Sequence, residues 1–170
     1  MKKSKEFLNN KKYKSHIKIF TDGSFSKKNK CVFAGYGVYF YNVDIDDISR
    51  KFTHDPITNQ RTELYAIYKG LKEVLRNYKF DKLTIFTDSM YSKNSITVWI
   101  NTWKDNNWKT ATKKPVKNKD LILKIDKYLS MKKYKQKIFI EHVRSHTNKT
   151  DYKSKGNERA DMLANKGALK

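Results

Sequence analysis

Two short segments of this sequence end in the same way, with a threonine and an aspartate followed by small polar residues. Ile17–Ser24 reads IKIFTDGS and Thr84–Ser89 reads TIFTDS, and both are rich in the β-branched and aromatic residues typical of β-strands. Each segment predicts a strand that ends immediately after its aspartate, Asp22 or Asp88. In an open sheet the reacting groups gather at the carboxyl ends of the strands, so we expect these aspartates side by side. Two carboxylates that close together repel each other unless a cation lies between them.

Two more carboxylates occupy positions from which they could join this pair. Glu63 lies beside the apolar face of a strongly amphipathic segment, and Asp161 lies in the last helical segment of the chain. Carboxylate oxygens are hard ligands that suit Mg²⁺ or Mn²⁺. Two such ions about 3.5–4 Å apart can activate a water molecule and stabilise the leaving oxygen when a phosphodiester bond is cut. His146, on the loop after the last predicted strand, could carry a proton in such a reaction, because histidine titrates near neutral pH.

The composition points to a polyanionic partner. The chain of 170 residues has 38 lysine and arginine residues against 17 acidic residues, which gives a net charge of +21. Nucleic acid is the first candidate for the partner, and an anionic membrane surface is the second. Almost all of the positive charge is lysine, which favours contact with the phosphate backbone over reading of the bases. The alternative is a lysine-rich coding bias that says nothing about partners.

Length and composition also bound the class of protein. A chain of this length favours one domain with a core of its own. The single cysteine, Cys31, cannot form a disulfide within the chain, and no segment resembles a membrane span or a secretory signal. The sequence therefore predicts a soluble intracellular protein, of the cytoplasm or nucleus, that acts as a monomer without a membrane partner.

The order of the predicted elements defines a fold class. Hydrophobic periodicity predicts five strands, at residues 17–22, 31–42, 48–54, 82–87 and 136–143. It predicts helices at residues 59–78, about 90–101, 120–131 and 156–169. Residues 1–15 are predicted to form a basic flexible arm, and residues 16–170 the folded domain. This order is typical of an α/β fold with one mixed sheet of five strands flanked by helices.

Five ordered motifs of the sequence resemble the signature blocks of type 1 ribonuclease H. These motifs are Thr21–Ser24, Thr58–Leu64, Thr87–Tyr91, Val143–His146 and Gly156–Asp161. The segment Trp99–Thr110 looks like that family's basic protrusion, and we expect the protrusion at about residues 102–119. The resemblance covers nearly the whole chain. It implies the RNase H-like fold, in which the first three strands are antiparallel and the fourth and fifth run parallel to the first.

The resemblance also implies an activity. It predicts an endonuclease that hydrolyses the RNA strand of RNA–DNA hybrids and leaves 3′-hydroxyl and 5′-phosphate ends. The implied mechanism uses two Mg²⁺ ions, which Mn²⁺ could replace. The residues that match the metal-binding catalytic acids are Asp22, Glu63, Asp88 and Asp161. His146 matches the catalytic histidine of the family's flexible loop.

Further matches imply contacts with each strand of a hybrid. The positions near the 2′-hydroxyls of the RNA strand are matched by Asn59, Gln60 and Met90. The positions that contact the DNA strand are matched by Thr58 and Asn118, in a phosphate pocket, and by Tyr91, Trp99 and Trp103, in an aromatic floor. The lysines of the protrusion are Lys104, Lys109, Lys113, Lys114 and Lys117.

The sequence departs from the family's pattern in two places. Pro56 stands where some members have an arginine in the DNA-phosphate pocket, which predicts a weaker pocket here. The step from His146 to Asp161 is longer than is usual, with residues 149–154 as the additional stretch. This stretch could change the mobility of the histidine.

Two other interpretations stay open at this point. A related nuclease of the same fold, such as a retroviral-type domain or a DNA-cleaving enzyme, would use the same acids on a different substrate. A non-catalytic module would keep only the basic surface and bind hybrids or duplexes; the complete set of acids disfavours it, because four unused carboxylates would repel one another. Trp103 and Trp108 could likewise be core anchors that do not contact a substrate.

Overall fold

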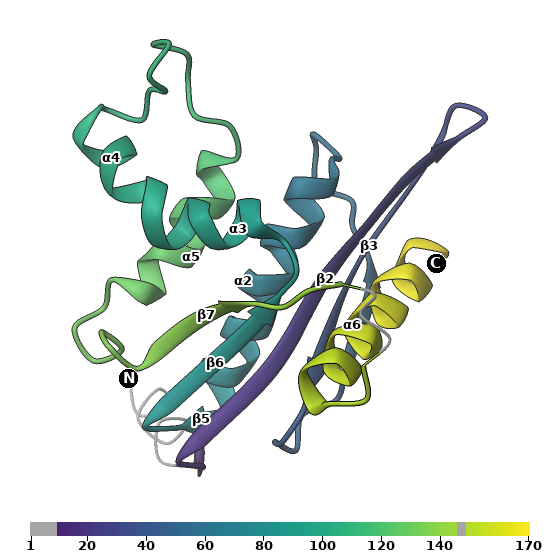
Figure 1. Ribbon diagram of the computed structural model, residues 1–170, viewed down its shortest axis with the longest axis vertical. Helices are drawn as coiled ribbons and strands as arrows, with labels where there is room; N and C mark the ends of the chain where they lie inside the picture. The colour runs from purple at the N-terminus through teal and green to yellow at the C-terminus, as the bar shows by residue number, and fades with distance from the viewer. Residues whose placement is uncertain (1–9, 146–148) are drawn as a thin grey trace, which may run out of the picture.

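A mixed five-stranded sheet organises the computed structural model, which describes residues 10–145 and 149–170 (Figure 1). Its strands lie in the order β4-β3-β2-β6-β7, with the bounds Ile48–Lys51, Cys31–Phe40, His16–Lys28, Lys82–Thr87 and Ile138–His142. β3 runs antiparallel to both β2 and β4, whereas β6 runs parallel to β2 and β7 runs parallel to β6. The predicted α/β class and the predicted strand directions are therefore confirmed.

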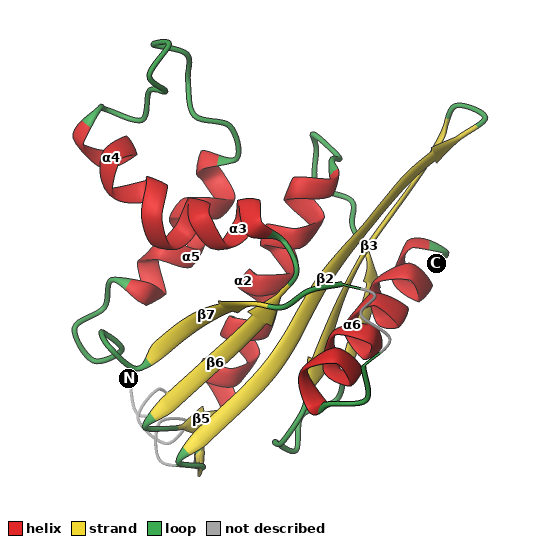
Figure 2. Ribbon diagram, in the orientation of Figure 1, coloured by secondary structure: helices red, strands yellow, loops and turns green. Residues whose placement is uncertain are grey.

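Helices cover both faces of this sheet (Figure 2). On one face, Ile19 of β2 packs among the buried leucine and isoleucine residues of α2 (Asn59–Asn77). The next residue of the strand, Phe20, points to the opposite face, where its ring lies against Gly156 of α6 (Tyr152–Ala168). This alternation follows the two-residue period of a strand, and it gives the sheet an apolar core on each side.

A run of helices follows β6 on the side of the sheet that α2 covers. α3 (Met90–Asn94), a π-helical turn η1 (Ser95–Trp99) and α4 (Ile100–Asp105) are continuous, and α5 (Lys119–Leu129) packs against them and against α2. The helix predicted at about 90–101 thus continues to Asp105, into the predicted protrusion. Among the helices of the described residues, none combines the length and the apolarity needed to cross a membrane.

The N-terminal segment is more ordered than predicted. β1 (Lys12–Tyr13) pairs in parallel with β5 (Tyr78–Lys79), which follows α2 directly. The N–H of Lys14 extends this pairing by donating to the carbonyl oxygen of Lys79 at 3.1 Å. These residues are polar and few, so they show no periodicity that a sequence could reveal, although they lie within the predicted arm. Residues 1–9 lie outside the described part of the chain.

β2 is longer than predicted. It continues past Asp22 to Lys28, because it stays paired with β3 in a hairpin whose turn is formed by Asn29 and Lys30. These two turn residues have positive φ angles of 48° and 66°, as a two-residue hairpin turn requires. The Gly-Ser pair that follows Asp22 therefore lies within a strand and does not end one.

α6 begins earlier than predicted, at Tyr152. Oδ1 of Asp151 caps the helix by accepting the N–H groups of Lys153 at 3.0 Å and Ser154 at 3.2 Å. The additional stretch of residues 149–154 thus supplies the cap and the first helical turn of α6.

Candidate active site

Asp22 and Asp88 lie close together because their strands pair in parallel. The ladder between β2 and β6 ends at the pair Thr21–Thr87, and each aspartate is the next residue of its chain segment. Asp88 follows the end of β6, as predicted. Asp22 lies within β2 and pairs with Gly37 of β3, so the prediction that its strand ends there is wrong. What ends at Asp22 is only the parallel pairing, while the antiparallel pairing continues.

Glu63 reaches this pair from the second turn of α2. The N–H of Gly23 donates both to Oδ1 of Asp22 at 2.8 Å and to Oε2 of Glu63 at 3.1 Å. A Cβ atom at position 23 would lie 2.3 Å from Oγ1 of Thr62 and 2.5 Å from the backbone nitrogen of Glu63. Glycine at this position is therefore what allows the strand and the helix to approach closely enough for the two carboxylates to meet.

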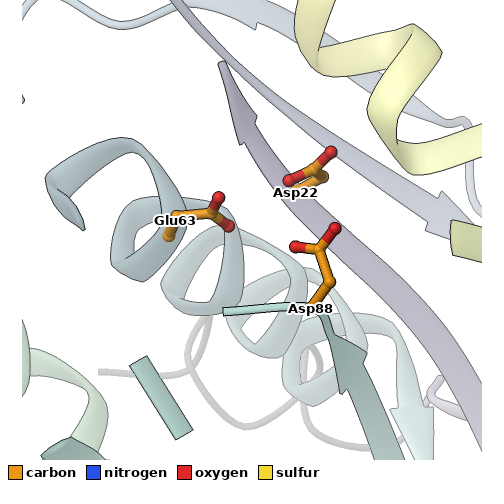
Figure 3. A group of neighbouring side chains, drawn as sticks. All are labelled: Asp22, Glu63 and Asp88. Carbon is orange, nitrogen blue, oxygen red and sulfur yellow. The ribbon is translucent and has the colours of Figure 1, made fainter. Parts of the chain in front are cut away.

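The three carboxylates form one cluster (Figure 3). Oxygen atoms of Asp22, Glu63 and Asp88, one from each residue, lie within 4.8 Å of one another. Burial and the charges of Asp88 and Asp161 raise the pKa of Asp22, which is 5% exposed, to about 8. Burial and the charges of Asp22 and Asp88 likewise raise the pKa of Glu63 well above its ordinary value. A cation bound between such carboxylates would offset their repulsion and favour their ionised forms. Their hard oxygen atoms suit a metal ion such as Mg²⁺.

Asp88 is held by two residues that sequence reasoning did not assign to the site. Nδ2 of Asn157 donates to Oδ2 of Asp88 at 3.2 Å, and Nε2 of His142 lies 3.2 Å from the backbone carbonyl oxygen of Asp88. Asn157 is 4% exposed, and its Oδ1 has no hydrogen-bond partner in the described structure. An unpaired, buried amide oxygen beside the carboxylates fits a site built for a cation and its water molecules. The only signal for Asn157 in the sequence was its place within the motif that ends at Asp161.

Asp161 lies near the cluster but outside its 4.8 Å grouping. It is half-buried on α6, and its charge contributes to the raised pKa of Asp22. Nδ2 of Asn165 donates to Oδ1 of Asp161 at 3.0 Å, and Oγ of Ser24 donates to Oδ1 of Asn165 at 2.7 Å. These bonds tie α6 to β2 beside the carboxylates. The predicted proton carrier, His146, lies outside the described residues.

The predicted RNA-strand residues lie at the starts of two helices. Asn59 and Gln60 are exposed in the first turn of α2, and Met90, the first residue of α3, is 50% exposed. Thr58, predicted to contact a DNA phosphate, caps α2: its Oγ1 accepts the N–H of Arg61 at 3.3 Å. Capping alone is a sufficient structural reason for this threonine.

Asn118 joins the predicted RNA-strand and DNA-strand residues. Its Nδ2 donates to the hydroxyl of Tyr91 at 2.9 Å and to Oε1 of Gln60 at 3.4 Å. Beside it lies an ion pair that sequence reasoning missed, in which Nη1 and Nη2 of Arg61 donate to the two carboxylate oxygens of Asp120 at 2.7 and 2.8 Å. Arg61 is buried, and its hydrogen bonds lower the pKa of the Asp120 carboxyl. The pair fixes the first turn of α2 against the first turn of α5, where Gln60 and Asn118 meet.

The three predicted aromatic contacts form a continuous row. The ring centroids of Tyr91 and Trp99 are 5.9 Å apart, and those of Trp99 and Trp103 are 5.8 Å apart. Trp108 extends the row, at 6.4 Å from Trp103. Trp99 is 38% exposed, whereas Trp103 and Trp108 are half-buried against the main core. Trp103 and Trp108 are thus anchored on the core, and their contact with a substrate stays a prediction.

The predicted protrusion is an exposed segment with a buried anchor. Val116 is buried, and its N–H donates to the carbonyl oxygen of Trp108 at 3.0 Å. The five predicted lysines are all exposed, namely Lys104, Lys109, Lys113, Lys114 and Lys117. Lys104 forms an ion pair with Asp126 at 2.7 Å, whereas the other four have no ion-pair partner in the described part of the chain.

Known proteins match this chain in sequence over most of its length. The sequence profile of the RNase H family matches residues 14–169. A ribonuclease H of Francisella philomiragia is 38% identical over 153 residues, which cover 90% of this chain and 91% of that protein. A probable ribonuclease H of Acanthamoeba polyphaga mimivirus and a ribonuclease H of Schizosaccharomyces pombe are each 39% identical, over 79% and 88% of this chain. The chain spans only 58% and 52% of the lengths of these last two relatives.

Solved structures match the fold. The PFV RNase H domain, determined in solution, superimposes with a TM-score of 0.73 at 28% identity, covering 90% of this chain and 94% of that domain. The foamy viral protease-reverse transcriptase in complex with an RNA/DNA hybrid gives a TM-score of 0.72 at 25% identity, covering 89% of this chain and 20% of that chain. The family profile, the relatives and the shared fold agree with the carboxylate cluster described above: this chain belongs to the ribonuclease H family.

Proposed function

We propose that this chain is an endonuclease that hydrolyses the RNA strand of RNA–DNA hybrids. The observation that carries this proposal is the convergence of Asp22, Glu63 and Asp88, from three separate elements, where the parallel pairing of the sheet ends. Membership of the ribonuclease H family supports it. The hybrid bound by the foamy viral protein of the same fold supports the choice of substrate.

The acids would hold two Mg²⁺ or Mn²⁺ ions. Asp22, Glu63 and Asp88 would bind them directly, and Asp161 would contribute from α6, which lies against the same strand. When bound, such ions supply an activated water molecule and positive charge at the leaving oxygen, which is the chemistry that leaves 3′-hydroxyl and 5′-phosphate ends. We assign to His146 the movement of a proton between the site and solvent.

The chain's own contacts position these acids. The N–H of Gly23 holds Asp22 and Glu63 together, and Asn157 fixes the orientation of the Asp88 carboxylate. Because these groups are already in place, little reorganisation is needed when the substrate phosphate arrives.

Selection of an RNA strand would come from the surface beside the cluster. The proposed contacts with the RNA strand and its 2′-hydroxyls are Asn59, Gln60 and Met90. The proposed contacts with the DNA strand are Thr58, Asn118, Tyr91, Trp99 and Trp103. The exposed lysines between α4 and α5 would attract the phosphate backbone without reading its sequence.

The test is cleavage of an end-labelled RNA–DNA hybrid by wild type and by Asp22→Asn, each with Mg²⁺, with Mn²⁺ and with EDTA. We expect wild type to cut only the RNA strand and only with metal, and Asp22→Asn to bind the hybrid without cutting it. Asp46→Asn, which changes an exposed acid in the turn before β4, is the matched control and should cut like wild type.

Three other outcomes would contradict the proposal. Binding by wild type that is unchanged in EDTA, with no cleavage under any condition, would identify a binding module. Cleavage of the DNA strand would show that the protein is a nuclease but that the proposed substrate is wrong. Full activity of Asp22→Asn would show that cleavage does not depend on the carboxylate cluster.

A further inference from the structure

Strands β2 and β3 extend beyond the rest of the sheet as a two-stranded ribbon. The pairing of β2 with β6 ends at Thr21 and the pairing of β3 with β4 ends at Gly35, but β2 and β3 stay paired as far as Lys28 and Cys31. This ribbon projects away from the helices as a long hairpin (Figures 1 and 2). Residues 25–32, which we call the hairpin arm, are all exposed.

The hairpin arm carries only positive charge. Lys27, Lys28 and Lys30 lie within it, and the sequence has no acidic residue between Asp22 and Asp44. None of the three lysines has an ion-pair partner in the described structure, whereas Lys12, Lys104 and Lys153 elsewhere each pair with an acid. Like charges on one narrow ribbon repel one another, so an anion bound there would relieve a real cost.

The arm begins three residues after Asp22 of the carboxylate cluster, on the same strand. Lys27 and Lys28 follow Asp22 by five and six residues on the same strand, which corresponds to about 17–20 Å at the usual rise of a strand. By the alternation of a strand, Lys27 lies on the face of Gly23 that packs against residues 62 and 63 of α2, and Lys28 lies on the opposite face with Asp22. The arm therefore carries a lysine on each of its faces as it leaves the site.

The arm and the lysines between α4 and α5 lie on opposite sides of the site. In Figure 1 the hairpin rises on one side of the end of β6, and the segment between α4 and α5 rises on the other. The end of β6, which Asp88 follows, lies between these two basic projections in this view. A polyanion placed over the carboxylates would thus have a basic surface at each side.

We propose that the hairpin arm binds the sugar–phosphate backbone of the nucleic-acid duplex that lies over the carboxylate cluster, on the side away from the lysines of residues 109–117. This inference rests on the proposed function, which places a duplex at the cluster. A distance of about 17–20 Å equals five to six base-pair steps at about 3.4 Å each, so the arm reaches the same duplex less than one turn from the cut. Lysine binds phosphate as a point charge, so the arm adds affinity without base preference.

The test compares two triple variants in the Asp22→Asn background, so that bound hybrid is not cut. One variant combines Lys27→Gln, Lys28→Gln and Lys30→Gln. The matched control combines Lys132→Gln, Lys133→Gln and Lys135→Gln, which removes the same charge from the exposed segment before β7, at the amino end of that strand. Affinity for a hybrid of about two helical turns is measured between about 50 and 200 mM salt, after thermal unfolding has shown that both variants fold.

We expect the arm variant to make the dependence of log K on log salt less steep by about 2–3, and to weaken binding at low salt by at least about tenfold. The control variant should keep the slope of the parent protein. With hybrids shortened step by step on either side of the cut, the arm variant and the parent should bind equally once the duplex extends less than about five base pairs toward the arm.

Several results would overturn the inference. The first is a slope of log K against log salt that is the same in the arm variant as in its parent. The second is an equal loss of hybrid affinity in the control variant. The third is an arm variant that loses binding to anionic lipid vesicles but keeps its binding to the hybrid. Failure of the proposed function is seen separately, in a wild-type protein that neither binds nor cuts the hybrid. A wild type that cuts the hybrid, with an arm variant that binds it as tightly as its Asp22→Asn parent at every salt concentration, rejects the arm alone.

Discussion

The acids of the carboxylate cluster and the exposed lysines of the protrusion and the hairpin arm differ in how firmly the structure holds their side chains. Asp22 and Glu63 are buried, and each accepts the N–H of Gly23 through contacts shorter than 3.2 Å. The lysines of residues 109–117 and of the hairpin arm are exposed, and in the described structure none of them is held by an ion pair.

The difference reflects the distances over which the two regions act. A metal site depends on oxygen atoms placed within tenths of an ångström, so it needs packed elements and a glycine that lets them approach. Attraction of a polyanion extends over a Debye length of about 10 Å at 0.1 M salt, so mobile side chains on turns are sufficient. We therefore expect large, cooperative effects from changes in the cluster, and small, additive, salt-dependent effects from changes in the lysines.

The largest effect is expected from Asp88→Asn, which keeps the shape of the side chain and removes its charge. Cleavage should fall by about 10²–10³-fold or more, because one of the proposed ligands to the metal ions is lost. Affinity for the hybrid should be kept or increased, since one negative charge is removed from the surface facing the phosphates. Single-turnover cleavage and binding in the same buffer measure both effects.

Asp105→Asn, an exposed acid at the end of α4, is the control for this comparison. It removes the same charge from the basic surface and should leave the rate of cleavage at wild-type level. An equal loss of rate in both variants would show that an acid in the cluster matters no more for cleavage than an acid outside it.

Gly23→Ala should act on stability as well as on rate. The new Cβ would collide with the backbone of residues 62 and 63, so α2 must move away from β2. We expect a loss of about 1–3 kcal/mol in the free energy of unfolding, as for other overpacked sites, and a loss of activity greater than this change in folding explains. Urea denaturation and cleavage assays test this together; Ser24→Ala, at the next position of the strand, should cost less than about 1 kcal/mol.

The raised pKa of Asp22 predicts a pH dependence of stability in the absence of metal. Its folded-state pKa of about 8 lies above its ordinary value of 3.8, so the folded state holds a proton that the unfolded state has lost. The stabilisation is therefore complete below about pH 4 and is lost as the pH rises toward 8. Between pH 5 and 8 in EDTA, wild type should lose at least about 1 kcal/mol relative to Asp22→Asn.

Urea denaturation at several pH values measures this difference. Addition of Mg²⁺ should remove most of the loss in wild type at pH 8, because the ion takes the place of the proton. Parallel curves for the two proteins in EDTA would show that Asp22 ionises normally in the folded chain.

The smallest effect is expected from a single lysine of the exposed surface, such as Lys113→Gln. Stability should change by less than about 0.5 kcal/mol, because the side chain is exposed and has no ion-pair partner among the described residues. The salt dependence of hybrid binding should lose about one unit of slope if this lysine contacts a phosphate. A steep loss of binding from this one substitution, independent of salt, would instead make it a specific contact of the kind found in the cluster.

The sequence by itself determined the main strands and helices of the fold and the three acids that meet. Alternating strands, an amphipathic helix over residues 59–78 and the repeated Phe-Thr-Asp segment are local patterns, so they can be identified without any contact between distant residues. The parallel neighbours β2 and β6 then place Asp22 and Asp88 together, and the position of Glu63 beside the apolar face of its helix turns it toward the sheet. That these acids bind metal stays a prediction.

Only the tertiary structure decided the contacts that join residues far apart in the chain. The bond from Asn157 to Asp88, the ion pair of Arg61 with Asp120 and the narrow space at Gly23 each depend on how two elements pack, and packing has no local period. The same holds for β1, which is too short and polar to be recognised until β5 lies beside it. The length of β2 was misjudged for the same reason: Gly-Ser is typical of a turn by local preference, and the pairing with β3 overrides that preference.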